Sequence, residues 1–174
     1  SSGIGSMSAS PGPFIFLDID GVLHSAEANK DTSCFGRPQM RQLQRIVEAT
    51  QAEIVLSSSW RLTPAFAEEA HQALVHHGLG APESNTPNLG SQGRAAEIKA
   101  WFETRGYCIR ATRWVALDDL PLAEDLPEEN VVTTESLVGL TEADAEQAIA
   151  KLHGRVLKAR RRALERTAFE SDES

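Results

Sequence analysis

Four short runs of apolar residues restrict the fold of this chain more than any other feature of its sequence. They are rich in β-branched and aromatic residues, and none alternates with polar residues as a strand with one solvent-facing side does. Continuous apolar strands are typical of parallel sheets, in which both faces are covered. The sequence therefore predicts buried parallel strands over residues 14–18, 53–57, 114–117 and 130–133.

Helical patterns lie between and after these predicted strands. A helix is predicted to begin at Thr63 and Pro64, which suit an N-cap and a first helical position. Another is predicted from about Arg94 to Gly106, and a further one opens with a capping-box-like pattern at 141–144. Strands that alternate with helices predict an α/β three-layer sandwich with a mostly parallel, Rossmann-like sheet. The residues predicted to face inward are Met40, Leu43, Ile46, Val47, Thr50, Phe66, Ala70, Ala73, Leu74, Ile98, Trp101, Phe102, Ala145, Ile149 and Leu152.

The length of 174 residues suits one domain with a single sizeable core. We expect this domain to span residues 13–153, with a small flap around residues 24–38, and residues 81–93 to form a polar loop with a short edge strand. Residues 1–12 are expected to be an artificial tag or a disordered N-terminus, and residues 154–174 a basic C-terminal helix or tail.

The charge is distributed unevenly along the chain. In residues 151–174, seven Lys and Arg against four Asp and Glu give +3, so the net charge of −8 leaves −11 for residues 1–150. An acidic body does not attract polyanions over its whole surface. Any phosphate-bearing partner is therefore expected to be held by a few local cations or by a metal ion.

The sequence contains no apolar stretch near the roughly 20 residues that span a bilayer, and no secretory signal. Its two cysteines, Cys34 and Cys108, fit a reducing compartment better than a disulfide scaffold, although one bridge stays open at this point. We expect a cytoplasmic protein with no membrane partner. The sequence carries no feature that sets the oligomeric state.

Polar residues follow three of the predicted strands directly. In open parallel sheets, ligands lie beyond the carboxyl ends of the strands, so these residues are expected to meet at one edge. Clustered carboxylates in a cleft are costly unless a cation neutralises them, and oxygen ligands favour Mg²⁺. The residues concerned are Asp18 and Asp20 after the first strand, Ser57, Ser58 and Ser59 after the second, and Asp118 and Asp119 after the third.

The run DIDGVL at 18–23 resembles the signature of haloacid dehalogenase-like (HAD) phosphohydrolases. Further runs resemble the small branch found as the phosphatase module of Swiss Army knife RNA-repair proteins and as stand-alone bacterial proteins. These runs are IVLSSSWR at 54–61, GRAAEIKAWF at 93–102, WVALDD at 114–119 and GLTEADAEQAI at 139–149. The resemblance covers about residues 13–153. It implies a Mg²⁺-dependent phosphatase that works through an aspartyl-phosphate intermediate.

The resemblance also implies roles for the acids. Asp18 would attack phosphorus as the nucleophile, and Asp20 would protonate the leaving oxygen and later deprotonate water. Asp118 would bind Mg²⁺ together with Asp18 and the backbone carbonyl of Asp20, and Asp119 would assist directly or through water. Without the resemblance, the same acids also fit a solvated turn or a structural ion.

The phosphate would be held by the Ser57 hydroxyl and by backbone N–H groups at Ser58 and Ser59. The family's third motif usually supplies a lysine, for which this sequence offers Arg94 and Lys99. A helix that precedes a parallel strand begins at the catalytic edge, and Lys99 lies about 7.5 Å further along the axis. We therefore favour Arg94 as a bidentate phosphate ligand. The alternatives are a helix-entry role for the serines and a surface ion pair between Arg94 and Glu97.

Other side chains near the predicted edge are interpreted as structural. Trp60 is interpreted as a packing residue, and Arg61 is a lesser candidate for substrate contact. The five histidines show no convincing metal-ligand spacing and are predicted to be surface residues. His24 follows the first motif closely, so it is a candidate to line the cleft, but a structural role is favoured.

The segments that carry cap domains in this family are short here, so we expect a minimal cap and an open cleft. Such a cleft would accept a nucleic-acid end phosphate, in keeping with RNA repair, and a small phosphorylated metabolite is the alternative. A receiver-like signalling domain has its adjacent acid pair first and a lone aspartate later, which is the reverse of this order. A catalytically idle phosphate-binding module is the third alternative.

Overall fold

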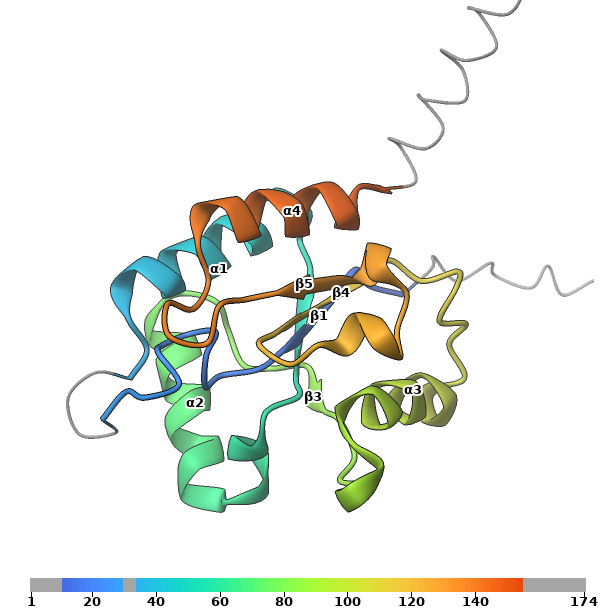
Figure 1. The fold of residues 1–174 in the computed structure, drawn as a ribbon, viewed down its shortest axis with the longest axis horizontal. Helices are drawn as coiled ribbons and strands as arrows, with labels where there is room; N and C mark the ends of the chain where they lie inside the picture. The colour runs from blue at the N-terminus through green and yellow to red at the C-terminus, as the bar shows by residue number, and fades with distance from the viewer. Residues whose placement is uncertain (1–10, 30–33, 155–174) are drawn as a thin grey trace, which may run out of the picture.

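Five parallel strands form one sheet at the centre of the fold (Figure 1). The computed structural model describes residues 11–29 and 34–154. The spatial order is β3-β2-β1-β4-β5, so the sheet is entirely parallel where the sequence predicted a mostly parallel one. The strands are β1 (Phe14–Leu17), β2 (Glu53–Leu56), β3 (Ser84–Asn85), β4 (Trp114–Asp118) and β5 (Val131–Thr133).

Helices cover both faces of this sheet, which confirms the three-layer α/β architecture. Helices α1 and α4 pack against each other on one face, and α3 lies on the opposite face (Figure 1). The helices are α1 (Arg37–Thr50), α2 (Pro64–His76), α3 (Arg94–Arg105) and α4 (Glu142–Leu152). Short 3₁₀ turns lie in the loops that follow strands β2, β3 and β4: η1 (Ser59–Leu62), η2 (Gly90–Gln92), η3 (Leu122–Glu124) and η4 (Glu128–Asn130).

Strand β1 divides its side chains between two hydrophobic clusters because successive strand residues point to opposite faces. Ile15 and Leu17 join the cluster under α1, α2 and α4. Phe14 and Phe16 join the cluster under α3, where their rings lie 4.9 and 5.1 Å from that of Trp101. A strand buried on both faces explains why its sequence is apolar throughout.

The helix ends follow the predicted signals. Thr141 and Asp144 form a complete capping box before α4, and Gly106 ends α3 in the left-handed conformation at φ 68°. Thr63 stands at the N-cap of α2 without a side-chain capping bond, and Pro64 follows it as the first helical residue. The polar loop 81–93 contains the predicted edge strand, β3.

Parts of the predicted organisation lie outside the described residues. They include residues 1–10, residues 30–33 of the flap, and residues 155–174 of the basic tail. The domain limits of 13 and 153 stay a prediction. Among the described residues, no helix combines the length and the apolar character needed to cross a membrane. No disulfide joins Cys34 and Cys108.

Candidate active site

Three aspartates meet at the carboxyl edge of the sheet. Asp18 directly follows β1, Asp118 is the last residue of β4, and Asp119 comes next. Strands β1 and β4 are neighbours with Leu17 opposite Leu117, so their following residues are brought side by side. One carboxylate oxygen from each of the three aspartates lies within 4.8 Å of the other two.

Two of these carboxylates are almost completely shielded from water. Asp18 is 5% exposed and Asp118 is 1% exposed. Burial, together with repulsion from Asp118, raises the pKa of Asp18 from 3.8 to about 8, although Arg94 opposes this shift. Burial also raises the pKa of Asp118. The cluster therefore has too little positive charge to keep both acids ionised. A divalent cation would favour the ionised forms of Asp18 and Asp118.

Arg94 is the cation that contacts this cluster. Its Nη1 lies 2.6 Å from Asp118 Oδ2 and 3.2 Å from Asp18 Oδ1. Burial alone would lower the pKa of Arg94, but Asp118 and Asp18 outweigh it and hold the pKa above its ordinary value. Arg94 is the first residue of α3, which agrees with the helix-end argument that favoured it over Lys99. It does not form the alternative ion pair with Glu97, whose partner is Arg61.

The serine run after β2 lies beside the cluster. The Ser57 N–H donates to the carbonyl oxygen of Leu17, which holds Ser57 next to Asp18. The Ser57 Oγ is buried and has no hydrogen-bond partner among the described residues. The Ser58 Oγ accepts a hydrogen bond from the backbone N–H of Trp60 and caps η1, so this hydroxyl already has a structural role. Since buried hydroxyls are usually paired, the Ser57 Oγ is suited to donate to a ligand.

Asp20 faces a different set of partners. Its Oδ2 accepts a bond of 3.0 Å from the Trp60 indole Nε1, and its Oδ1 lies 2.7 Å from His24 Nε2. Its side chain is 46% exposed, in contrast to the buried Asp18 and Asp118. The prediction that all five histidines lie on the surface is therefore wrong for His24, because its ring packs beneath this carboxylate and is 3% exposed.

The remaining histidines fit the surface prediction better. His71 and His76 are exposed, and His77 and His153 are partly exposed. The structural interpretation of Trp60 as a packing residue is confirmed by its burial, but its bond to Asp20 was missed. A possible signal was the spacing of four residues between Asp20 and His24, which a tight turn brings together.

The chain turns sharply at Gly21, the residue directly after Asp20. Gly21 has a φ of +77°, and a Cβ there would lie 2.3 Å from the Asp119 Oδ2. Only glycine satisfies both the conformation and the close approach. The loop after β5 fixes the same region, since Thr134 Oγ1 donates to the Gly21 carbonyl and Ser136 Oγ donates to Asp119 Oδ2. Sequence reasoning missed both of these residues.

Arg61 is held within the protein. Its guanidinium forms a buried ion pair with Glu97 and donates to the backbone carbonyls of Ser58, Thr86 and Pro87. Each of its three nitrogens therefore has a protein acceptor. This network joins the serine run to α3, which supports a structural role rather than the substrate contact considered for Arg61.

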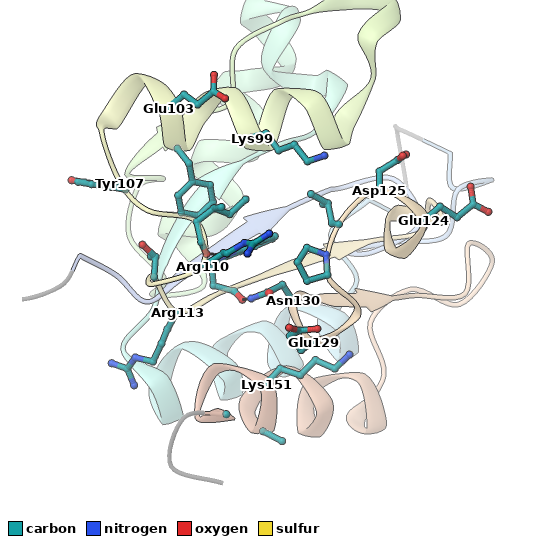
Figure 2. Close-up of a pocket in the computed structure, with 18 residues that line it drawn as sticks. Lys99, Glu103, Tyr107, Arg110, Arg113, Glu124, Asp125, Glu129, Asn130 and Lys151 are labelled. Atoms are coloured by element: carbon teal, nitrogen blue, oxygen red, sulfur yellow. Dashed lines mark hydrogen bonds between the residues drawn. The ribbon is translucent and has the colours of Figure 1, made fainter. Parts of the chain in front are cut away.

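A larger hollow lies away from the aspartates, against α3 (Figure 2). Its volume is about 1250 Å³, and Trp114, at the start of β4, lines it. Asp118 ends the same strand, so the hollow lies toward the opposite end of β4 from the acid cluster. Lys99 and Arg110 line it together with Glu103 and Glu124 (Figure 2). It contains none of the predicted site residues, so the aspartate cluster is the candidate active site.

A comparison with protein families supports this assignment. The model of a family described as the HAD domain in Swiss Army Knife RNA repair proteins matches residues 14–145. This range includes all of the aspartates described above and most of the chain. It supports a phosphohydrolase as the kind of enzyme. Searches of curated proteins and of solved structures gave no match.

Proposed function

The chain belongs to the family of HAD domains found in Swiss Army Knife RNA repair proteins, and we propose that it is a Mg²⁺-dependent phosphomonoester hydrolase. The observation that carries this proposal is the buried cluster of Asp18, Asp118 and Asp119 with Arg94 and the unpaired hydroxyl of Ser57 beside it. Such a cluster is costly to fold and gains nothing from packing alone. It is the arrangement that a phosphate and a divalent cation require.

The donor set fits Mg²⁺. Asp18, Asp118 and Asp119 offer carboxylate oxygens that lie within 4.8 Å of one another, and we assign the backbone carbonyl of Asp20 as a further ligand. The raised pKa of Asp18 supports the same assignment, because it marks a site that is short of positive charge. When bound, Mg²⁺ supplies the positive charge that keeps these carboxylates ionised and polarises a phosphoryl oxygen.

In the first half of the reaction, a carboxylate oxygen of Asp18 attacks phosphorus and the bond between phosphorus and the leaving oxygen breaks. Asp20 gives its proton to that oxygen, so the product leaves as an alcohol. In the second half, the ionised Asp20 takes a proton from water, which attacks the phosphorus of the aspartyl-phosphate. Inorganic phosphate is released, and Asp18 regains its carboxylate and Asp20 its proton.

Three groups are assigned to phosphate binding. The Ser57 hydroxyl donates to a phosphoryl oxygen, and the Ser58 backbone N–H assists it, since the Ser58 hydroxyl oxygen already accepts from Trp60. Arg94 supplies charge to the same oxygens from its position 3.2 Å from Asp18. A guanidinium is suited to this because its donors match two phosphate oxygens at once.

We propose a nucleic-acid end phosphate as the substrate, and a small phosphorylated metabolite as the second candidate. The family description, which names RNA repair proteins, favours the first. We propose the cytoplasm as the location of this protein, which is in keeping with two cysteines, Cys34 and Cys108, that are both free.

The test is phosphate release from matched substrates with and without Mg²⁺. Oligonucleotides that carry a 3′- or a 5′-phosphate are compared with sugar phosphates and nucleotides at equal concentration. We expect Mg²⁺-dependent release that is fastest from one of the oligonucleotides and is absent in Asp18→Asn. Faster release from sugar phosphates would overturn the nucleic-acid assignment, and no release from any substrate would overturn the phosphatase assignment.

A further inference from the structure

We propose that His24 and Trp60 are positioning residues that orient the Asp20 carboxylate for proton transfer. The inference rests on the proposed function, because it concerns the acid that serves the leaving oxygen. Neither residue is proposed to touch the reacting atoms. Both act through Asp20, and their effect should depend on how much help the leaving group needs.

The two donors fix both oxygens of the carboxylate. His24 Nε2 lies 2.7 Å from Oδ1, and the Trp60 indole Nε1 lies 3.0 Å from Oδ2. A half-exposed carboxylate held by one bond, or by none, is free to rotate about its terminal torsion, whose minima are broad. Two donors on different oxygens define the plane of the group. Each oxygen keeps a second lone pair, which is where a transferable proton is held.

The donors are themselves held rigidly beneath Asp20. His24 and Trp60 are 3% and 2% exposed, and their ring centroids lie 5.7 Å apart. Phe35 packs edge-on against both rings, at 5.6 Å from His24 and 5.4 Å from Trp60. Aromatic rings packed in this way have little freedom to turn. The positions of the two donor hydrogens are therefore set by the hydrophobic core.

The backbone determines which nitrogen of His24 donates. The Phe35 N–H lies 3.2 Å from His24 Nδ1, which must accept this bond and leaves the ring hydrogen on Nε2, facing Asp20. Phe35 holds a φ of +56°, an unfavourable value for a bulky residue. This strained residue presents its N–H to the histidine, which is a structural reason for the unusual conformation.

The other tryptophans of the chain show that this arrangement is not a requirement of packing. The indole of Trp101 donates to Ser84 Oγ, and that of Trp114 donates to the carbonyl of Ile109, both remote from the aspartates. The Trp60 indole instead meets His24 at a single half-exposed carboxylate, two residues beyond the proposed nucleophile. Packing alone would not bring both donors to the same acid.

The kinetic test compares a substrate with a good leaving group, 2,4-dinitrophenyl phosphate, with an alkyl phosphate. The alkyl oxygen needs a proton as it leaves, whereas the dinitrophenolate does not. For Trp60→Phe and His24→Ala we expect kcat/KM on the alkyl phosphate to fall about tenfold or more, with little change in kcat/KM on the aryl phosphate. The comparison uses kcat/KM because it reports the steps up to departure of the leaving group, whereas kcat also includes hydrolysis of the aspartyl-phosphate, in which Asp20 serves both substrates equally. His24→Gln, whose amide nitrogen reaches toward the place of Nε2, should recover part of the loss. Trp101→Phe and His71→Gln are the matched controls and should leave both rates unchanged.

Equal losses of kcat/KM on the two substrates, or no loss on either, would overturn the positioning role while leaving the phosphatase intact. A wild-type protein that turns over neither substrate would instead overturn the proposed function.

A second measurement does not depend on turnover or on metal. In ¹⁵N NMR spectra of the metal-free protein, we expect His24 to carry its hydrogen on Nε2 and the Trp60 indole resonance to move in Asp20→Ala. A hydrogen on Nδ1, or an indole resonance that does not respond to the loss of Asp20, would overturn the proposed geometry.

Discussion

The two ends of strand β4 differ in what they offer a ligand. At its start, Trp114 lines a hollow of about 1250 Å³, surrounded by charged side chains of both signs (Figure 2). At its end, Asp118 lies in a small buried cluster in which three carboxylates face one guanidinium. The larger space holds balanced charges that water solvates, whereas the small cluster holds three acids whose charge the one guanidinium offsets only in part. Incompletely compensated buried charge indicates the chemistry here, and the size of a cavity does not.

The largest expected effect comes from removing an acid at the aspartate cluster, compared with removing an acid at the hollow. Asp18→Asn should lower phosphate release about a thousandfold or more, because an amide cannot form the aspartyl-phosphate. Asp125→Asn, which removes an exposed acid from the hollow, is the matched control and should change the rate less than twofold. Substantial turnover by Asp18→Asn at saturating Mg²⁺ would contradict the assigned nucleophile. The measurement is steady-state phosphate release, with circular dichroism to check folding.

The cations give the next largest contrast. Arg94→Ala should lower kcat/KM about a hundredfold, because it removes the charge beside Asp18 and the assigned phosphate donor. Lys99→Ala and Arg110→Ala, on the hollow, should each have an effect of less than twofold. If Lys99→Ala were the more damaging change, the helix-end argument for Arg94 would be wrong.

The buried acids should also make stability depend on pH when metal is removed. The pKa of Asp18 rises from 3.8 to about 8 on folding, so between these values the folded state binds more protons than the unfolded state. In EDTA, the free energy of unfolding should therefore fall as the pH rises from about 4 to 8, by up to about 1.4 kcal/mol per pH unit.

The check on this slope is urea unfolding at a series of pH values. Asp18→Asn should flatten the slope, and Mg²⁺ should reduce it because the ion favours the ionised carboxylates. A metal-free wild type whose stability increases over this pH range would contradict the charge imbalance inferred for the cluster.

The smallest expected effect concerns a hydroxyl. Ser57→Ala should lower kcat/KM about tenfold, the lower end of the value for a hydrogen bond to a charged group such as the phosphate. Its stability should be unchanged or slightly higher, because the Ser57 Oγ has no partner among the described residues and its burial is a cost. Ser59→Ala removes an exposed neighbouring hydroxyl and should affect neither quantity. A loss of stability in Ser57→Ala without a loss of rate would indicate a structural hydroxyl.

Much of the fold could be predicted because its signals are local. Continuous apolar runs indicated the parallel strands, and the capping box at Thr141 and the glycine at 106 indicated helix ends to within a residue. The meeting of Asp18 and Asp118 also followed from sequence, since parallel strands carry the residues after them to one edge. The position of Arg94 beside these acids followed from the direction of a helix, and its preference over Lys99 as phosphate ligand stays a prediction.

The parts that sequence reasoning missed depend on side-chain direction. His24 is buried because a tight turn folds it back under Asp20, and no periodicity reports such a turn. The partners of Arg61 are a carboxylate on α3 and three backbone carbonyls, which only the packed structure brings together. Ser136 contacts Asp119, which lies 17 residues earlier in the chain. Thr134 contacts Gly21, which lies 113 residues earlier. Pattern alone does not identify such contacts.

The most direct test of Asp18 as the nucleophile is to trap the phosphorylated aspartate. The protein is mixed with substrate and Mg²⁺, quenched in acid during turnover, and analysed by peptide mass spectrometry. We expect one added phosphoryl group, located on Asp18, formed only when Mg²⁺ is present. A phosphoryl group on another residue, or rapid phosphate release with no modified aspartate, would contradict the assignment of Asp18 as the nucleophile.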